Sequence, residues 1–255
     1  MDADFSVELG PDDPVLDFPW KDPAGKLAYF DLKRQPELIT QLEETQKFPE
    51  LAEFLRAINS PRSPMQSAKC DAWSTTNLTP EEEIFNATFK FASYVDLVFA
   101  DANEAEAIRP TVDRAVDRAN DRAKIDDAKT PRRQSFPAHE DIAKRLTELL
   151  RRAPEMPASV EVIIRRCFFV IAAAPREASN PLEGFYFSLY VNGYGKDEST
   201  ACRQWTVALK LAANAITQVS AKSGPDPKKA YKPLSKKYFT KKRKCRPQSE
   251  STPPL

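Results

Sequence analysis

The chain has 255 residues, 41% of them hydrophobic, so it can bury a substantial core, and disorder throughout is excluded. Its formal net charge of +1 conceals an asymmetry, because residues 222–246 hold 11 of the 38 Lys and Arg residues and only one acid, Asp226. This segment carries about +10, and the remainder, with 27 bases and 36 acids, carries about −9. The longest apolar run, residues 167–174, has eight residues and is too short to cross a bilayer.

The first 36 residues combine prolines with large apolar side chains. Pro14, Pro19 and Pro23 interrupt any helix, whereas the apolar side chains are expected to be covered rather than free in solvent. We therefore predict an extended N-terminal arm over residues 1–36 that lies on the folded body, with a short strand at 26–32. No basic residue followed by an apolar run occurs at the start, so we predict no secretory signal and a cytoplasmic location, or a nuclear one in a eukaryotic host.

The segment from 36 to 124 predicts helix, strand, strand and helix in that order. Apolar residues recur with a helical period over 36–59, with a break at Pro49. Strands are predicted at 65–76 and 88–100, and in the second of them apolar and polar residues alternate, as in a sheet with one apolar face. In a following helix at 103–124, Asp, Arg and Ala recur every four residues, which predicts a solvated charged face.

The second half of the chain repeats this order of elements. After a linker at 125–137, we predict a helix at 138–153, strands at 159–173 and 185–194, and a long helix at 197–221. One side of the long helix is apolar throughout and is predicted to lie in the core: Ala201, Trp205, Ala208, Leu209, Ala212 and Ile216.

These elements predict the α+β class, with an antiparallel sheet or sheets built from two β-hairpins and covered by amphipathic helices. The repeated order indicates an internal duplication of the helix-strand-strand-helix unit, with pseudo-repeats at 37–124 and 138–222 inside one domain over 37–222. Residues 223–255 are rich in Lys, Pro and Ser, and we predict that this basic tail is disordered unless it is bound.

Motifs of catalysis and cofactor binding are not found in the sequence. His139 is the only histidine, so a histidine metal cluster cannot be built and a Ser/His/Asp triad depends on this one residue. The glycines of residues 192–199 fail the phosphate-loop pattern, which requires a glycine at 190 and Ser or Thr at 197. No CxxC pair is formed by Cys70, Cys167, Cys202 and Cys245, so we expect reduced thiols and no metal site. Because catalytic and cofactor motifs are missing, we expect no cofactor and favour a non-enzymatic role over an enzymatic one.

Alternation in the predicted strands places aromatic and polar side chains together on one face of the sheet. If the phenylalanines of 185–194 point to the core, the tyrosines between them point to the opposite face. Rings mixed with hydrogen-bonding groups form good recognition surfaces, because each ring supplies contact area at low entropic cost. The predicted partner-binding residues are Trp73, Tyr94, Asp96, Tyr186, Tyr190, Asn192 and Tyr194. The alternative is structural, because such residues also fill the outer layer of a sheet.

The basic tail contains the segment KKYFTKKRKCRP at 236–247, which combines cations for phosphates with rings for stacking. Its predicted polyanion-binding residues are Lys236, Lys237, Lys241, Lys242, Arg243, Lys244 and Arg246. The same segment is compatible with anionic lipid, RNA, an acidic partner or the acidic body of this chain, and KKRK also passes as a nuclear localisation signal. The sequence thus predicts a negatively charged partner for the tail without identifying it.

Three functions remain open at this point. The first hypothesis is a non-enzymatic binding or scaffold protein that uses the aromatic face for a protein partner. The second is a nucleic-acid-associated protein whose tail makes non-specific contacts with phosphates. The third is an enzyme with carboxylate or tyrosine chemistry around Tyr94 and Asp96. A deep pocket joining Asp96 to Arg165 or Arg166 favours the enzyme, and a flat aromatic patch favours the scaffold.

Overall fold

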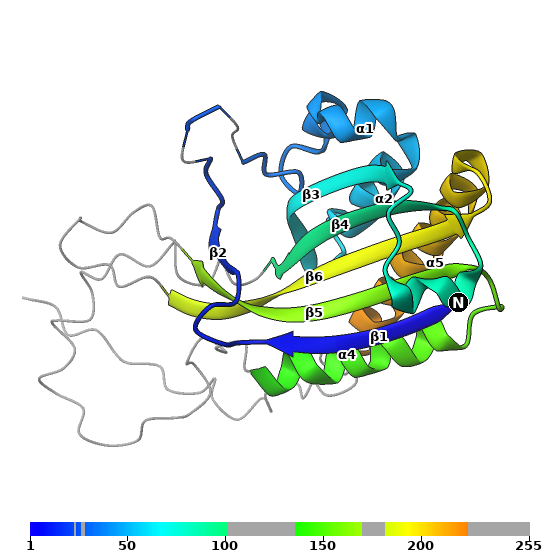
Figure 1. The fold of residues 1–255 in the computed structure, drawn as a ribbon. Helices are drawn as coiled ribbons and strands as arrows, with labels where there is room; N and C mark the ends of the chain where they lie inside the picture. Colours follow the sequence, from blue (N-terminus) through cyan, green and yellow to red (C-terminus); the bar gives the residue numbers. More distant parts are fainter. Residues whose placement is uncertain (23, 27–28, 101–135, 170–181, 224–255) are drawn as a thin grey trace, which may run out of the picture. The chain divides into compact units, whose positions relative to one another are not determined.

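The structure is a computed structural model that describes residues 1–22, 24–26, 29–100, 136–169 and 182–223. It has a mixed α+β architecture with a six-stranded sheet, which confirms the α+β part of the predicted fold class (Figure 1). The strands are β1 (Asp2–Glu8), β2 (Val15–Phe18), β3 (Met65–Thr75), β4 (Phe89–Phe99), β5 (Ala158–Phe169) and β6 (Leu182–Gly195).

Apart from the short η2 (Pro80–Phe85), for which no helix was predicted, the helical elements lie close to the positions that the apolar periodicity predicts. They are the short η1 (Pro36–Gln41), α1 (Glu43–Lys47), α2 (Pro49–Ile58), α4 (Phe136–Arg151) and α5 (Glu198–Ser223). The predicted break at Pro49 is confirmed, because this proline occupies the first turn of α2, where its missing N–H group is not needed. The helix predicted at 103–124 and most of the linker predicted at 125–137 lie outside the described residues.

The sheet has the strand order β1-β5-β6-β4-β3. Two antiparallel pairs, β3 with β4 and β5 with β6, are joined in one sheet because β4 also pairs with β6. At the far side of β5, β1 and β2 both run parallel to it, one after the other along its length.

The N-terminal region was predicted as an extended arm over residues 1–36, but part of it forms the parallel strands β1 and β2. Residues 2–8 and 15–18 are extended, but they belong to the sheet rather than lying on it. The short strand expected at 26–32 is absent from the described part of that segment, which has turn and irregular structure. The loop at 9–14 separates the two strands and contains Pro11 and Pro14, which cannot donate to a strand ladder.

One face of the sheet, called the inner face, is covered by α2, α4 and α5 (Figure 1). The predicted apolar side of the long helix is confirmed, because all six of its residues are buried. Trp205 is fully buried at the centre and donates a hydrogen bond from Nε1 to Ser93 Oγ over 2.8 Å. A Cβ atom on Gly193 would lie 2.1 Å from the Trp205 backbone nitrogen, so glycine at this position lets α5 approach the sheet closely.

The opposite face, called the outer face, is covered at both ends. At one end a second apolar cluster includes residues of β2 and of the strands beneath it: Leu16, Phe18, Val98, Cys167, Phe169 and Tyr186. At the other end η2 lies over the sheet, and the ring of Phe85 stacks on that of Tyr194 at a centroid distance of 4.1 Å. The middle of the outer face, between these two covered ends, carries polar and aromatic side chains.

Candidate functional site

The strand register sets the outer-face side chains in rows that run across the sheet. One row, here called the central row, contains a residue from each of β3, β4, β6, β5 and β1. Its members are Asp71, Tyr94, Tyr190, Glu161 and Asp4. The side chains of paired residues point to the same face, so two rings lie between carboxylates in this row.

Aromatic rings continue beyond the central row to the edge strand β3. The ring of Trp73 lies 6.4 Å from that of Tyr94, which in turn lies 5.9 Å from the ring of Tyr190. On the other side of Tyr190, the Arg165 guanidinium carbon lies 5.9 Å from the ring centroid. These distances are in the range of favourable ring–ring and cation–π contacts.

Exposure distinguishes these side chains from a buried layer. Trp73 retains 36% of its surface, and Tyr94, Tyr190 and Asn192 are half-buried. The position between Trp73 and Asn192 in the register is occupied by Ala92, which is small and buried. We define the open face as the surface formed by two groups of residues. They are the half-buried or exposed Trp73, Tyr94, Tyr190 and Asn192, and the carboxylates of Asp71, Glu161 and Asp4.

A chain of hydrogen bonds lies beneath the open face and joins four strands. Ser188 Oγ donates to Asp96 Oδ1 over 2.6 Å and accepts from Arg165 Nη1 over 3.0 Å. Arg165 also donates from Nε to Glu8 Oε2 over 2.8 Å. Asp96 is 6% exposed and Ser188 is fully buried, whereas the Glu8 side chain at the end of the network keeps 34% of its surface. The network holds Arg165 in place beside Tyr190.

Burial shifts the acid–base properties of this network. It raises the pKa of the Asp96 carboxyl, and this effect is opposed by the hydrogen bond from Ser188 and by the charges of Lys69 and Arg165. Burial also raises the pKa of the Tyr94 phenol, with a further contribution from Asp96. The phenol therefore stays neutral at physiological pH and acts as a hydrogen-bonding group.

The structure brings together four of the seven predicted partner-binding residues on the open face: Trp73, Tyr94, Tyr190 and Asn192. Asp96 lies below them in the hydrogen-bonded network. Tyr186 is 3% exposed within the second apolar cluster, and Tyr194 is 1% exposed beneath η2. The alternation rule gives the correct face for both tyrosines, but neither ring reaches solvent.

The ring of Tyr194 is held by polar partners as well as by Phe85. Its phenol donates to Glu82 Oε1 over 2.8 Å and lies 3.1 Å from Ser159 Oγ. Glu82 also forms an ion pair with Lys90. Burial alone would raise the pKa of Glu82, but hydrogen bonds from Lys90, the Thr79 amide and Tyr194 outweigh it, so the pKa is lowered. Tyr194 therefore anchors η2 to the sheet.

Sequence reasoning missed the acidic half of the open face. Asp4 is separated in sequence from Glu161 by most of the chain, and only the parallel pairing of β1 with β5 makes them neighbours. For Asp4, the signal that could have revealed a strand is the alternation of polar residues with Ala3, Phe5 and Val7 in the first eight residues. The seven predicted polyanion-binding residues of the basic tail lie outside the described residues.

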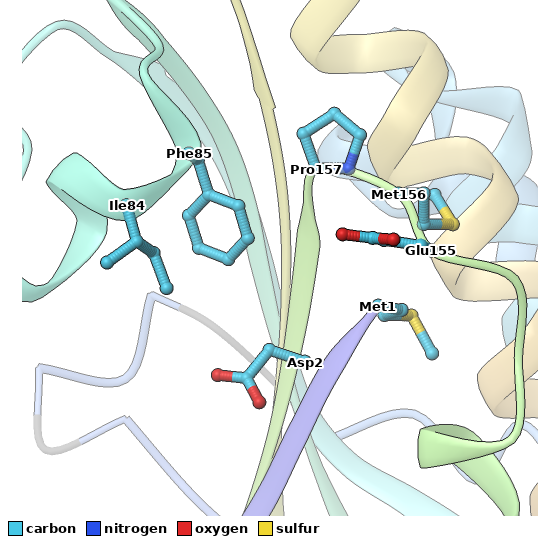
Figure 2. A pocket seen from close by; sticks show the side chains of 7 residues that line it. All are labelled: Met1, Asp2, Ile84, Phe85, Glu155, Met156 and Pro157. Atoms are coloured by element: carbon cyan, nitrogen blue, oxygen red, sulfur yellow. The ribbon is translucent and has the colours of Figure 1, made fainter.

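A hollow of about 580 Å³ opens beside the open face, at the end covered by η2. Figure 2 shows Ile84 and Phe85 of η2 on one side and Met1, Met156 and Pro157 on the other, and two acidic residues also line the hollow: Asp2 and Glu155. Ile84 is 74% exposed, which is unusual for a large apolar side chain.

Comparison of this chain with protein-family models, with curated proteins and with solved structures gives no match. The described residues contain no group of three or more His, Cys, Asp or Glu side chains arranged to hold a metal ion. Within the same residues, no helix has both the length and the apolar character needed to span a membrane.

Proposed function

We propose that this chain is a binding protein that uses the open face to hold a segment of another protein. The row of rings from Trp73 through Tyr94 to Tyr190 is the observation that carries the proposal. Rings at the centre of a recognition surface supply a large share of binding energy, because they exclude water over a wide area at low entropic cost. The covered ends of the outer face limit the binding region to the middle of the sheet.

The rigidity of the supporting sheet favours this role. The rings project from adjacent strands in register, and the Asp96, Ser188 and Arg165 network fixes the side chains beneath them. A preorganised surface loses little conformational entropy when a partner binds. Binding to the open face is therefore compatible with an unchanged fold.

The enzyme hypothesis has weaker support. Asp96 and Arg165 are joined through Ser188, but the joining atoms are buried under other side chains. A general acid or base must reach the proton that it transfers, within hydrogen-bonding distance of the reactant. The raised pKa of Asp96 is accounted for by burial and does not require a catalytic role.

The nucleic-acid hypothesis depends on the basic tail and not on the open face. Asp71, Glu161 and Asp4 are exposed acids on that face, and acidic groups repel phosphates. If polyanions bind this protein, the tail is the segment whose charge favours it.

The experiment is selection from a display library of randomised twelve-residue peptides against the full chain. Enriched peptides are expected to bind the Trp73→Ala variant about tenfold more weakly, because large rings at interface centres contribute on this scale. The Val207→Ala variant is the control, since Val207 is 47% exposed on α5, on the helical side of the sheet. Thermal unfolding of each variant checks that the fold is intact.

Backbone amide shifts on titration with an enriched peptide give an independent map of the binding site. Shifts confined to β3, β4 and β6 around the rings support the proposal. Enriched peptides whose affinity is unchanged by Trp73→Ala, or whose shifts map to the helices, would remove it.

A further inference from the structure

Charge on the open face is arranged around the rings in a way that selects a partner. Asp71 lies at one side of the two tyrosines of the central row, and Glu161 and Asp4 lie at the other. All three carboxylates belong to exposed residues. Asp4 shares an ion pair with Arg151 over 3.1 Å, and the Glu161 carboxylate accepts a hydrogen bond from Ser6 over 3.4 Å. Within the described residues, neither Asp71 nor Glu161 forms an ion pair.

The cations that lie near this surface already have partners. Arg165 pairs with Glu8 over 2.7 Å, and Lys90 pairs with Glu82 over 2.8 Å. Lys69 Nζ lies 4.8 Å from the ring centroid of Trp20. On α1, Lys47 pairs with Glu43, which is the main cause of its raised pKa, and the charge of Asp71 contributes least. The uncompensated charge presented by the central row is therefore negative.

The outer face also shows that its rings accept cations. The Arg165 guanidinium lies against Tyr190, and the Lys69 ammonium lies over Trp20. A cation over an aromatic ring is attracted by the negative face of the π system, and a nearby carboxylate adds to that attraction. Trp73 and Tyr94, beside Asp71, offer the same chemistry to a cation from outside.

The register fixes the spacing that such a partner needs. Asp71 and Glu161 are separated by three strand-to-strand steps, from β3 through β4 and β6 to β5. Adjacent strands lie about 4.8 Å apart, so the two backbone positions are about 14 Å apart. An extended chain advances about 3.4 Å per residue, so about four residues cover this distance.

We propose that the open face binds an extended protein segment that crosses the strands and carries two Lys or Arg residues about four positions apart, one for Asp71 and one for Glu161. The aliphatic stems of these residues, and the residues between them, cover Trp73, Tyr94 and Tyr190. Lys and Arg suit the surface because their stems pack on apolar rings while their charged ends reach the carboxylates. This inference rests on the proposed function and specifies its partner.

The test uses the peptides enriched by display against the full chain, with fluorescence anisotropy of labelled synthetic copies as the readout. The enriched sequences are expected to share two basic residues separated by three to five positions. Replacing either basic residue by Gln is expected to weaken binding about tenfold, as is Asp71→Asn or Glu161→Gln in the protein. Binding is expected to weaken as salt is raised, because the paired groups remain partly solvated.

Glu53→Gln is the matched control, because Glu53 is an exposed acid on α2 in the helical layer and its loss should leave affinity unchanged. If Trp73→Ala weakens binding but Asp71→Asn and Glu161→Gln do not, the open face binds a partner and the basic-pair inference is wrong. The same inference is overturned if the enriched peptides are acidic or have basic residues without a shared spacing. If none of the three variants matters, the proposed function fails as well.

Discussion

The pKa of the Asp96 carboxyl is subject to two opposing effects. Burial favours its neutral form, whereas the hydroxyl of Ser188 and the cations of Lys69 and Arg165 favour the carboxylate. Because burial is the largest of these effects, the pKa of Asp96 in the folded protein is higher than in the unfolded chain. Between these two pKa values the folded state binds more protons, so stability falls as pH rises through that window.

Replacing Asp96 by Asn removes this titration. The free energy of unfolding of Asp96→Asn, relative to that of the wild type, is expected to rise as pH increases from the ordinary carboxyl pKa through the raised pKa of Asp96. Above that window the two profiles are expected to run parallel. Urea denaturation at intervals of one pH unit measures the difference. Ser188→Ala is the companion variant: loss of its hydrogen bond raises the pKa of Asp96 further and extends the wild-type decline to higher pH. Parallel profiles for Asp96→Asn and the wild type over the whole range would contradict this account.

For single residues, the sequence predicts correctly which face of the sheet a side chain lies on. It does not predict which segments cover that side chain. Alternation in β6 correctly assigns Tyr186, Tyr190 and Tyr194 to the outer face. Only Tyr190 remains part of the open face, because Tyr186 is buried in the second apolar cluster and η2 covers Tyr194. Covering segments are distant in sequence, and no local pattern reports their contact.

At the scale of elements, α5 and β6 are fitted to each other through glycine. Gly193 and Gly195 both face the first turns of α5, and a Cβ on Gly193 would lie 2.4 Å from the Ala201 carbonyl oxygen. Close approach of backbones brings Trp205 into contact with Phe91 and Phe48. The two glycines at this end of β6 thus allow the helix and the sheet to pack closely.

Gly193→Ala is therefore expected to destabilise the protein by about 3 kcal/mol, because helix backbone cannot yield as a flexible side chain can. Urea denaturation followed by tryptophan fluorescence measures the loss. Gly10→Ala is the control, since its Cβ would meet only the end of the Asp13 side chain, at 2.9 Å, and should cost much less. Equal stability of the two variants would show that α5 moves away from the sheet without cost.

Elements with a strong local period were predicted within a few residues, and the N-terminal strands were not. β4 alternates along its whole length, and the apolar side of α5 repeats over several turns. In contrast, β1 and β2 pair with β5 across more than 150 residues, and the prolines around them indicate irregular structure. The two antiparallel strand pairs were expected from local patterns, whereas the parallel edge depends on long-range pairing.

For the molecule as a whole, an internal duplication remains a prediction. The antiparallel pairs β3–β4 and β5–β6 have corresponding places in the sheet order, on either side of the β4–β6 contact. The first pair is preceded by α2 and the second by α4, as the repeat predicts. The closing helix of the first pseudo-repeat falls at 103–124, outside the described residues, so the comparison with α5 is still to be made.

Charge is also divided along the chain, and the last prediction follows from this division. Ending the chain after Gly224 removes ten of the eleven basic residues found between 222 and 246. The truncated protein is expected to keep its melting temperature, because every core residue of the described part of the chain precedes residue 220. It is also expected to lose binding to a labelled single-stranded RNA, since the remainder of the chain is acidic overall and repels phosphates.

A salt titration of both forms against that RNA separates the tail from the folded body. Binding by the full chain is expected to fall on the order of a thousandfold between about 50 and 200 mM salt, because released counterions supply the driving force. Heparin in place of RNA should give the same pattern, since the contacts are with charge and not with bases. Equal RNA binding by the two forms removes the tail from the interaction, and tight binding that persists at high salt assigns specific contacts to the folded body.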